Sequence, residues 1–590
     1  MSDRFARDPP FGANLTPDGH TRFRFWAPAQ QTVSVALEGG PLLPMERSPD
    51  GWFEATAPCG AGARYRYRLA DCTLVPDPAS RAQADDVHGP SAVIDPRAYA
   101  WRDPGWQGRP WRETVLYELH VGTCGGFAGV AKWLPRLRDL GVTAVELMPI
   151  NDFPGRRNWG YDGVLPYAPD AAYGTPDALK SLVDTAHEMG LMIFLDVVYN
   201  HFGPDGNYLS LYAPQFFRQD HKTPWGPAID FRQPVVRSFF TENVLLWLME
   251  YRFDGLRFDA MHAIEEQDWV DEMAAAVRAT VETGRHVHLV LEHHNDASHL
   301  EKDCDAQWND DGHNVLHVLL TGEHGGYYAD YVDRPAEKLA RCLADGFIFQ
   351  GEHCRYLDAP RGMPSAHLPP TALVLFLQNH DQIGNRAFGE RLTTLSDPPA
   401  LEAAIALMLL CPQIPLLFMG EEDASRTPFL FFTDHNQELA VAVREGRRNE
   451  FARFPAFADP STRECVPDPN AVRTFEASVP HADPRHGAAR NALYRRLIAL
   501  RHAEIVPRLD GTRSIAARAV GAKAVLARWR LGDGAVLTIG TNLGGEPAAM
   551  SAPAGELLFA TWPDAAQQAQ AGCLARHATV AYLERESADE

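Results

Sequence analysis

The chain has 590 residues, of which 45% are hydrophobic and 22% charged, and this composition is typical of a globular protein with two to four domains. Its 77 acidic and 55 basic residues give a formal net charge of −22. Such a balance argues against a nucleic-acid-binding protein, because phosphate contacts require clustered lysine and arginine. No apolar run approaches the roughly 20 residues that a membrane-spanning helix needs.

The first residues lack the apolar core of a signal peptide. Nine cysteines are scattered singly, without the C-x-x-C spacing of a zinc site. Their odd number and their spacing predict reduced thiols rather than a disulfide framework. We therefore expect a cytoplasmic protein that binds neither membrane nor nucleic acid.

Residues 1–97 are predicted to form an N-terminal immunoglobulin-like β-sandwich. Short runs with a high proportion of β-branched, aromatic and alternating apolar residues recur here, and turns rich in Gly, Pro and Asp separate them. The predicted strands are 21–26, 32–37, 52–55 and 64–69. We expect most aromatic side chains of this region to pack in its core, although some could stack on sugars.

Residues 98–508 are predicted to form an α/β domain, a (β/α)8 TIM barrel enlarged by loop insertions, because strand-like runs alternate with helical ones. The predicted strands are 115–119, 144–148, 191–197, 255–258, 287–291, 306–308, 371–377 and 414–417, and the sixth is the least marked. The predicted helices are 130–140, 176–189, 235–251, 269–283, 400–410 and 488–502.

Residues 509–590 return to a β pattern. Segments 524–531 and 535–539 flank Gly532-Asp533-Gly534, which is typical of a hairpin turn. Further strands are expected at 556–562 and 578–583. We predict a small C-terminal β-sandwich.

Polar residues follow several of the predicted barrel strands. Because catalytic groups of such barrels lie where strands end at the C-terminal face, these side chains are expected to converge on one rim. Glycoside transfer explains the set best, since it needs one carboxylate as nucleophile and a second carboxyl group as proton donor. The residues are Tyr161 after strand two, Asp196 and His201 on strand three, Arg257 and Asp259 on strand four, Glu292 after strand five, and His380 and Asp381 after strand seven.

Arg257 and Asp259 lie two residues apart in a strand, so their side chains point to the same side. The pairing would keep a buried carboxylate ionised. On these residues alone, a purely structural ion pair is an equal alternative. Asp196 lies deeper on its strand, and we expect it to support Arg257 or His201.

Segments 196–201, 257–259, 291–295 and 378–382 resemble the four signature regions of the α-amylase family of retaining glycoside hydrolases. This resemblance implies that Asp259 is the nucleophile, Glu292 the acid/base and Asp381 the carboxylate that steadies the distorted sugar. It also implies that Arg257 holds Asp259 ionised. The implied sugar contacts are hydrogen bonds from His201 and His380 and stacking by Tyr161.

Segments 159–164, 312–323, 376–386 and 415–422 resemble the maltooligosyltrehalose trehalohydrolase branch of that family. The resemblance implies hydrolysis of the α-1,4 bond next to the terminal trehalose of maltooligosyltrehalose, without a cofactor. It also implies a functional partner, a maltooligosyltrehalose synthase. Gln382, and His317 or Glu323, are hypothesised to contact the trehalose.

Other functions stay open at this point. A glycogen branching or debranching enzyme shares the motifs, and a non-catalytic glycan-binding protein could keep the fold. Asn200 lies where calcium-binding relatives place a ligand, but no oxygen cage is apparent nearby. His293, His294, Asp296 and His299 could suggest a metal cluster. Adjacent histidines cannot easily face one ion, so we expect solvent or substrate contacts instead.

Overall fold

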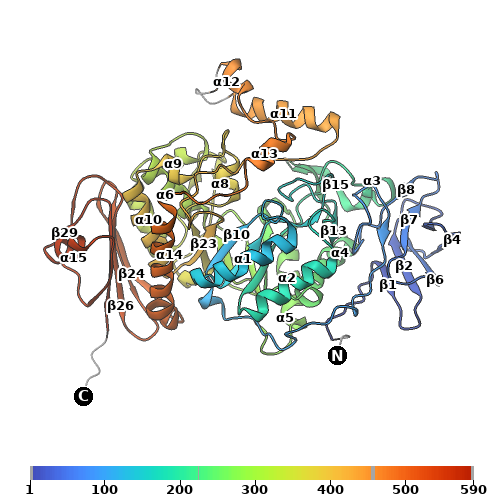
Figure 1. Cartoon of the computed structure of the whole chain (residues 1–590), viewed down its shortest axis with the longest axis horizontal. Coiled ribbons are helices and arrows are strands. Elements are labelled where there is room, and N and C mark those ends of the chain that lie inside the picture. The colour runs from blue at the N-terminus through green and yellow to red at the C-terminus, as the bar shows by residue number, and fades with distance from the viewer. Residues whose placement is uncertain (1–3, 224, 453–456, 458, 586–590) are drawn as a thin grey trace.

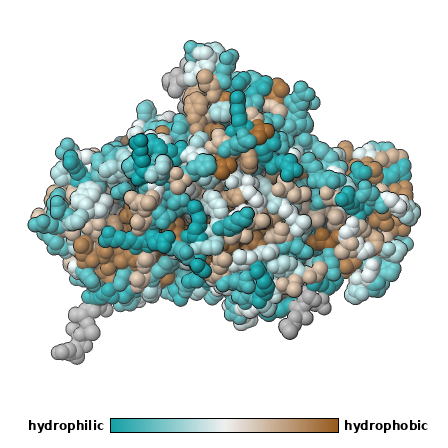
Figure 2. All heavy atoms as spheres, viewed as in Figure 1, coloured by the Kyte–Doolittle hydropathy of each residue, from teal (hydrophilic) through white to brown (hydrophobic). Residues whose placement is uncertain are grey.

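The computed structural model describes residues 4–223, 225–452, 457 and 459–585. Figure 1 shows three parts along the long axis, namely a β-sandwich at the N-terminal end, a central barrel, and a β-sheet at the C-terminal end. Polar residues are spread over the whole face seen in Figure 2. None of the helices in the described ranges has the length and apolar sequence needed to cross a membrane.

The N-terminal part is a sandwich of two antiparallel sheets, as predicted. Its core is aromatic: Phe25 stacks on Tyr67 with ring centroids 4.1 Å apart, and Phe23 meets Tyr65 at 4.9 Å. All four side chains are buried, so they hold the sheets together. One sheet has the order β1 (Gly12–Leu15), β2 (Thr21–Trp26), β6 (Trp52–Ala57), β5 (Glu46–Arg47), and the other β4 (Leu42–Pro44), β3 (Ser34–Leu37), β7 (Arg64–Arg68), β8 (Leu74–Val75), with β9 (Ser91–Ala92) beside β7.

The central part is a closed barrel of eight parallel strands, which confirms the predicted fold. Even the three-residue sixth strand lies where it was predicted. Packing inside the barrel is tight, because a Cβ on Gly255 would come within 2.1 Å of the Phe194 ring. The strands in barrel order are β10 (Leu116–Leu119), β11 (Ala144–Leu147), β14 (Met192–Val198), β17 (Gly255–Asp259), β18 (His288–Leu291), β19 (Ala306–Trp308), β22 (Leu373–Phe376) and β23 (Ile414–Phe418), and β23 pairs with β10.

Helices surround this barrel (Figure 1). The predicted helix 130–140 begins earlier, at Gly126, because Gly125 adopts a left-handed conformation with φ 90° and starts the turn. The last predicted helix ends at Leu500 and continues as a π-helical turn. The main helices are α1 (Gly126–Leu140), α2 (Pro176–Glu188), α4 (Pro234–Leu245), α5 (Asp268–Thr280), α6 (Asp310–Thr321), α7 (Pro335–Asp345), α10 (Pro398–Leu410) and α14 (Gly487–Leu500).

Loop insertions extend the barrel, as expected, although the sequence did not indicate their form. Figure 1 shows α11 (Gln437–Phe451), α12 (Pro460–Glu464) and α13 (Val472–Glu476) standing above the barrel. Further insertions are the strand pairs β12 (Asn151–Asp152) with β13 (Leu165–Pro169), β15 (Phe217–Thr223) with β16 (Gly226–Ile229) and β20 (His353–Cys354) with β21 (Ala359–Pro360), and the short helices α3 (Leu209–Tyr212), α8 (His380–Gly384) and α9 (Leu392–Leu395).

The C-terminal part is a five-stranded antiparallel sheet that packs on the barrel through α7 and α10. Trp529 donates a hydrogen bond to the carbonyl of Leu343 in α7, and Thr579 donates one to Ala403 in α10. The strand order is β24 (Arg513–Gly521), β25 (Ala524–Arg530), β26 (Val536–Asn542), β30 (Ala578–Glu584), β28 (Glu556–Ala560). The pair β27 (Ala548–Ala549) and β29 (Cys573–Leu574) and the unpredicted helix α15 (Pro563–Gln570) complete this part.

Candidate active site

The interior of the barrel changes from apolar to charged along most of its strands. Side chains alternate in a strand, so residues two apart share a face. An apolar cluster, which includes Phe194, Val290 and Trp308, fills the lower interior. On five strands, the residue two positions after a member of this cluster is charged. These residues are Glu118 after Leu116, Glu146 after Ala144, Asp196 after Phe194, Glu292 after Val290 and Asp310 after Trp308.

Arg257 on β17 is the cation at the centre of this charged rim. Its guanidinium is fully buried and donates to Asp196 at 2.7 Å, to Asp259 at 2.8 Å and to Glu292 at 2.5 Å. The Trp308 ring lies beneath it, 4.2 Å from the guanidinium carbon. One arginine therefore fixes three carboxyl groups from three neighbouring strands.

Asp259 and Glu292 bind adjacent nitrogens of that guanidinium, which favours the short separation of about 5 Å found in retaining glycosidases. Ala260 strengthens the link, since its backbone N–H donates to the Glu292 carboxylate at 2.9 Å. Its φ of 42° is rare for a residue other than glycine. Such local strain often occurs at functional sites.

Burial raises the pKa of Asp259 above its ordinary value, and Glu292 adds to this effect while Arg257 opposes it. Asn200 also binds Asp259, because its side-chain amide donates to the carboxylate at 2.9 Å and to the backbone carbonyl at 3.0 Å. Asn200 thus helps to hold the predicted nucleophile in place by direct hydrogen bonds. Burial raises the pKa of Asp196 to about 7, although Arg257 opposes that shift.

His380 and Asp381 lie in the first turn of α8, at the end of β22. A ring nitrogen of His380 lies 2.5 Å from the Glu118 carboxylate, and the other lies 3.5 Å from Asp381. Burial disfavours the charged imidazole, but Glu118 and Asp381 outweigh it and raise the pKa of His380 to about 9. This histidine is therefore a cation at neutral pH.

Tyr161 and His201 complete the part of the site that was expected to hold the sugar. The Tyr161 ring stacks on His380 with centroids 5.0 Å apart, and its hydroxyl donates to Asp196 at 2.6 Å. His201 places Nε2 at 3.0 Å from the Tyr161 carbonyl. Trp225 stacks on His201 at 5.6 Å. His380 thus covers one face of the Tyr161 ring, and a bound sugar would have to contact the other face or the edge of the ring.

The three residues expected near the trehalose differ in their surroundings. Gln382, the residue after Asp381, accepts a hydrogen bond from the Tyr327 hydroxyl at 3.2 Å. His317 instead contacts Glu323 at 2.7 Å, and Arg386 binds both oxygens of Glu323 at 2.7 and 2.9 Å. The polar groups of His317 and Glu323 are committed to this network, which argues against sugar contacts for them.

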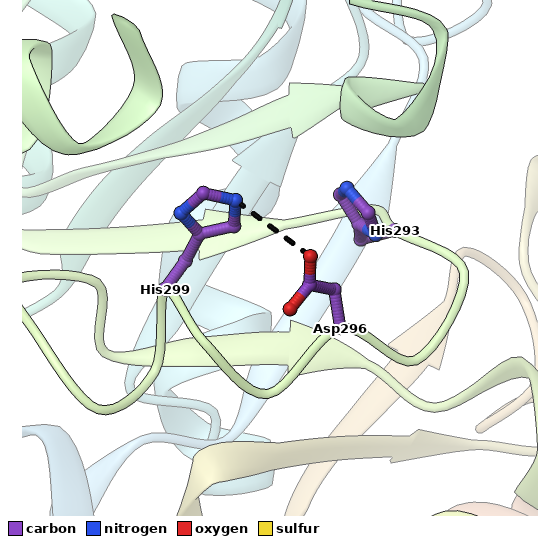
Figure 3. Close-up of side chains that lie close together, drawn as sticks. All are labelled: His293, Asp296 and His299. Atoms are coloured by element: carbon purple, nitrogen blue, oxygen red, sulfur yellow. Dashed lines mark ion pairs between the residues drawn. The ribbon is translucent and has the colours of Figure 1, made fainter. Parts of the chain in front are cut away.

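The group His293, Asp296 and His299 has residue types that could hold a metal ion. Figure 3 shows the three side chains together on the loop after β18. However, the side-chain carbonyl of Gln267 lies 2.9 Å from Nε2 of His299 and 3.3 Å from Nε2 of His293. Nδ1 of His293 accepts a backbone hydrogen bond from His294 at 2.9 Å, so its Nε2 carries the proton in the neutral ring.

Burial lowers the pKa of His293 to about 4, so that ring is neutral and donates to Gln267. His299 is buried, and its Nδ1 lies 2.8 Å from Asp271. The solvent or substrate contacts expected for this group are therefore wrong for His299. The hydrogen bonds make the group a brace of the loop that carries Glu292, because Gln267 also donates to the backbone of Met261.

Sequence reasoning did not single out Glu118, Glu146 or Asp310. The signal was present, since each of them continues a row of alternating interior residues past the apolar layer. Glu118 and Glu146 are also direct neighbours in the β10–β11 register. Extending the period-2 pattern by one step on every strand would have found all three residues.

Models of known protein families match each of the three parts of the fold. Family models match in chain order: Carbohydrate-binding module 48 (Isoamylase N-terminal domain) at residues 10–85, Alpha amylase, catalytic domain at 99–213, and a Domain of unknown function (DUF3459) at 512–580.

Individual relatives match over most of their length. A malto-oligosyltrehalose trehalohydrolase from Deinococcus radiodurans is 42% identical over 84% of this chain and 83% of its own. Another from Rhizobium sp. is 39% identical over 92% of this chain and 94% of its own. A crystal structure described as an α-amylase from Salmonella typhimurium has a TM-score of 0.92 at 42% identity, and the match covers 98% of this chain and 100% of that one.

Together, the barrel, its carboxylate rim and these matches define a glycoside hydrolase of the α-amylase family. Within it, the chain belongs to the family of the malto-oligosyltrehalose trehalohydrolases. This membership confirms the resemblance seen in the sequence. A branching enzyme is thereby disfavoured as the family of this chain.

Proposed function

We propose that the protein hydrolyses the α-1,4 bond next to the terminal trehalose of maltooligosyltrehalose and releases trehalose and a maltooligosaccharide. The observation that carries this proposal is the high identity, over most of the chain, to relatives that bear the trehalohydrolase name. The arginine-linked pair Asp259 and Glu292 supports a retaining mechanism.

In the first step, Glu292 donates its proton to the glycosidic oxygen, and the bond from that oxygen to the anomeric carbon breaks. An oxygen of Asp259 attacks the same carbon and forms a β-linked glycosyl ester. Positive charge on the flattened sugar ring is stabilised by the carboxylates of Asp259 and Asp381. Trehalose leaves with the proton.

In the second step, Glu292 accepts a proton from a water molecule, whose oxygen attacks the anomeric carbon from the face opposite Asp259. The bond from that carbon to the Asp259 oxygen breaks, and the carboxylate is released. The maltooligosaccharide is released with its α configuration retained, and Glu292 is protonated again. Arg257 would orient both carboxyl groups throughout. His201 and His380 would bind sugar hydroxyls, Tyr161 would contact the ring, and Gln382 would contact the trehalose.

The proposal includes the reaction that supplies the substrate. Some enzyme must convert the reducing end of a maltooligosaccharide into trehalose, and a maltooligosyltrehalose synthase fits this role as a functional partner. All nine cysteines are unpaired, which is compatible with the reducing cytoplasm. We therefore propose a cytoplasmic enzyme.

Product analysis with maltotriosyltrehalose tests this function. Trehalose and maltotriose are expected as the sole products, whereas glucose or linear products alone would contradict the proposal. Glycogen serves as the comparison substrate, because a branching or debranching enzyme would alter its α-1,6 links and a trehalohydrolase would leave them.

A further inference from the structure

Glu118 on β10 binds His380 through both of its carboxylate oxygens. One oxygen lies 2.5 Å from Nδ1 of the His380 ring, and the other accepts the backbone N–H of the same residue at 3.2 Å. A carboxylate can only accept hydrogen bonds, so Nδ1 of the ring is the donor. Both side chains are buried, and a charge-assisted hydrogen bond is stronger where water is excluded.

This contact joins two strands that are not neighbours in the barrel. β23 lies between β10, which carries Glu118, and β22, which leads into α8. The backbone of Glu118 is itself fixed, since its carbonyl accepts a hydrogen bond from Met419 at 3.0 Å. The bond from the His380 N–H to Glu118 therefore fixes the first turn of α8. Asp381, the third carboxylate of the proposed mechanism, is the next residue in that turn.

The other nitrogen of the His380 ring faces the site. Nε2 lies 3.5 Å from a carboxylate oxygen of Asp381, and it makes no hydrogen bond among the residues that the structure describes. Tyr161 stacks on the ring with centroids 5.0 Å apart, and Trp159 lies perpendicular to it at 5.5 Å. These rings restrict rotation of the imidazole. Because Nδ1 is bound to Glu118, Nε2 is the nitrogen left for a ligand.

Several elements place titratable groups around His380. Burial alone would lower the pKa of its ring, but Glu118 first and Asp381 second oppose this and raise it to about 9, while Arg257 acts against them. The groups are Glu118 on β10, His120 directly after it, Glu146 on β11, Tyr161 after β12, Asp196 on β14, Arg257 on β17 and Asp381 in α8. Glu118 is thus the main source of the positive charge on this ring.

We propose that Glu118 is a positioning residue of the reaction, which aims the Nε2–H of a doubly protonated His380 at the sugar and fixes the turn that carries Asp381. The inference rests on the proposed function, in which His380 binds a sugar hydroxyl. A neutral imidazole has one proton for two nitrogens. If that proton stayed on Nδ1, Nε2 would turn a lone pair toward the sugar and toward Asp381. Only the charged ring donates on both sides.

The substitution Glu118→Gln removes the charge and keeps an oxygen that can accept from Nδ1. We expect the titration midpoint of His380 to fall by about two units, the size expected when a paired carboxylate is lost. The ring ¹⁵N chemical shifts measure this midpoint. The chain has 23 histidines, and the signal of His380 is the one that disappears in His380→Gln.

Activity gives a second measurement on the same variant. The ratio of its kcat/KM on maltotriosyltrehalose to that of the wild type should fall about tenfold between about pH 6 and about pH 8, because the variant ring loses its charge in that range. Glu118→Asp keeps the charge on a shorter side chain. In that variant His380 should remain a cation, and the activity ratio should not change with pH.

Asp254→Asn is the matched control. Asp254 precedes β17 at the opposite end of the barrel and forms another buried carboxylate–histidine pair, with His187 at 3.0 Å. Its substitution therefore shows what the loss of such a buried carboxylate does away from the rim. The midpoint of His380 and the pH dependence of the activity should both stay as in the wild type.

The outcomes separate this inference from the proposed function. Wild-type protein that releases no trehalose from maltotriosyltrehalose would overturn the function. A neutral His380 in the wild type at neutral pH would overturn the inference, whether or not the variants fold. An active wild type with an unshifted His380 midpoint in Glu118→Gln would do the same. A shifted midpoint with an activity ratio that does not depend on pH would also contradict it, since the charge of His380 would then not be used.

Discussion

The lower and upper halves of the barrel interior are built from the same strands and serve opposite purposes. In the lower half, Phe194, Val290 and Trp308 are apolar and buried, so they stabilise the fold. Two residues further along, Asp196, Glu292 and Asp310 are acidic. Stability and chemistry are thus separated by about 7 Å along these three strands.

Burial of acidic groups in the upper half of the barrel interior costs free energy of folding, and the apolar lower half has no such cost. Both carboxylate oxygens of Glu146 are buried without a hydrogen-bond partner among the described residues. Burial, Glu118 and Asp196 raise the pKa of Glu146 well above its ordinary value. Arg257 and the charged His380 offset only part of the acidic charge. Substitutions in the upper half should therefore affect catalysis without destabilising the fold, and those in the lower half should do the reverse.

Asp259→Asn should have the largest effect, and it belongs to the upper half. Removal of the nucleophile should lower kcat on maltotriosyltrehalose by a factor on the order of 10⁴. The free energy of unfolding should change by less than about 1 kcal/mol, because burial already disfavours the charge that is removed. Steady-state kinetics and chemical denaturation of the same sample measure both. A large loss of stability would break the proposed separation.

Phe194→Ala tests the lower half. The ring packs against Gly255 and stacks on His288 at 6.0 Å, so its removal leaves a cavity in the lower interior. The free energy of unfolding should fall by about 3–5 kcal/mol. The kcat measured well below the unfolding transition should stay near that of the wild type. Denaturant titration gives the first value, and a strong loss of kcat in folded protein would argue against the comparison.

Glu146→Gln should give a smaller effect, which depends on pH. The folded-state pKa of Glu146 lies above its ordinary value of 4.5, so its contribution to stability is complete below about pH 4.5 and is lost as the pH rises toward the folded-state pKa. Glutamine does not titrate. Wild type should therefore lose stability relative to the variant by up to about 1.4 kcal/mol per pH unit above that point. Denaturation at several pH values measures this difference, and parallel curves would contradict the protonated state of Glu146.

Gln382→Ala should have the smallest effect. Loss of one hydrogen bond of about 1 kcal/mol would lower the preference for maltotriosyltrehalose over maltopentaose about fivefold. Glu323→Gln is the comparison. Glu323 is bound to Arg386 and His317, so its substitution should leave the substrate preference unchanged. The measurement is the ratio of kcat/KM on maltotriosyltrehalose to kcat/KM on maltopentaose. An unchanged ratio for Gln382→Ala would remove it from the trehalose contacts.

Strand positions and carboxylates could be predicted because they depend on local patterns. The eight barrel strands are short apolar runs. Asp259 and Glu292 lie where two of those runs end, and Asp381 lies in the helical turn α8 that follows β22. The barrel helices α6 and α7, the insertion α11–α13 and the helix α15 were not predicted. In α11, Phe451 is the one buried residue, so packing against the rest of the fold leaves little mark on its sequence. The binding partner of Glu323 could not be predicted either, since Arg386 lies 63 residues away in the sequence.

The interior rows show a second limit. Glu118, Glu146 and Asp310 obey the same alternation as Asp196 and Glu292, yet a carboxylate gives no sign in the sequence of whether it finds a partner. Glu118 meets His380, whereas Glu146 meets no hydrogen-bond donor among the described residues. That difference arises only when distant strand ends come together on one rim.

Trapping of the covalent intermediate tests the central claim most directly. A fluorinated α-glucosyl fluoride, which slows the second step, should label the protein, and peptide mass spectrometry should place the sugar on Asp259. The Asp259→Asn variant should remain unlabelled under the same conditions. Labelling of another carboxylate, or release of the sugar with inverted configuration, would contradict the proposed mechanism.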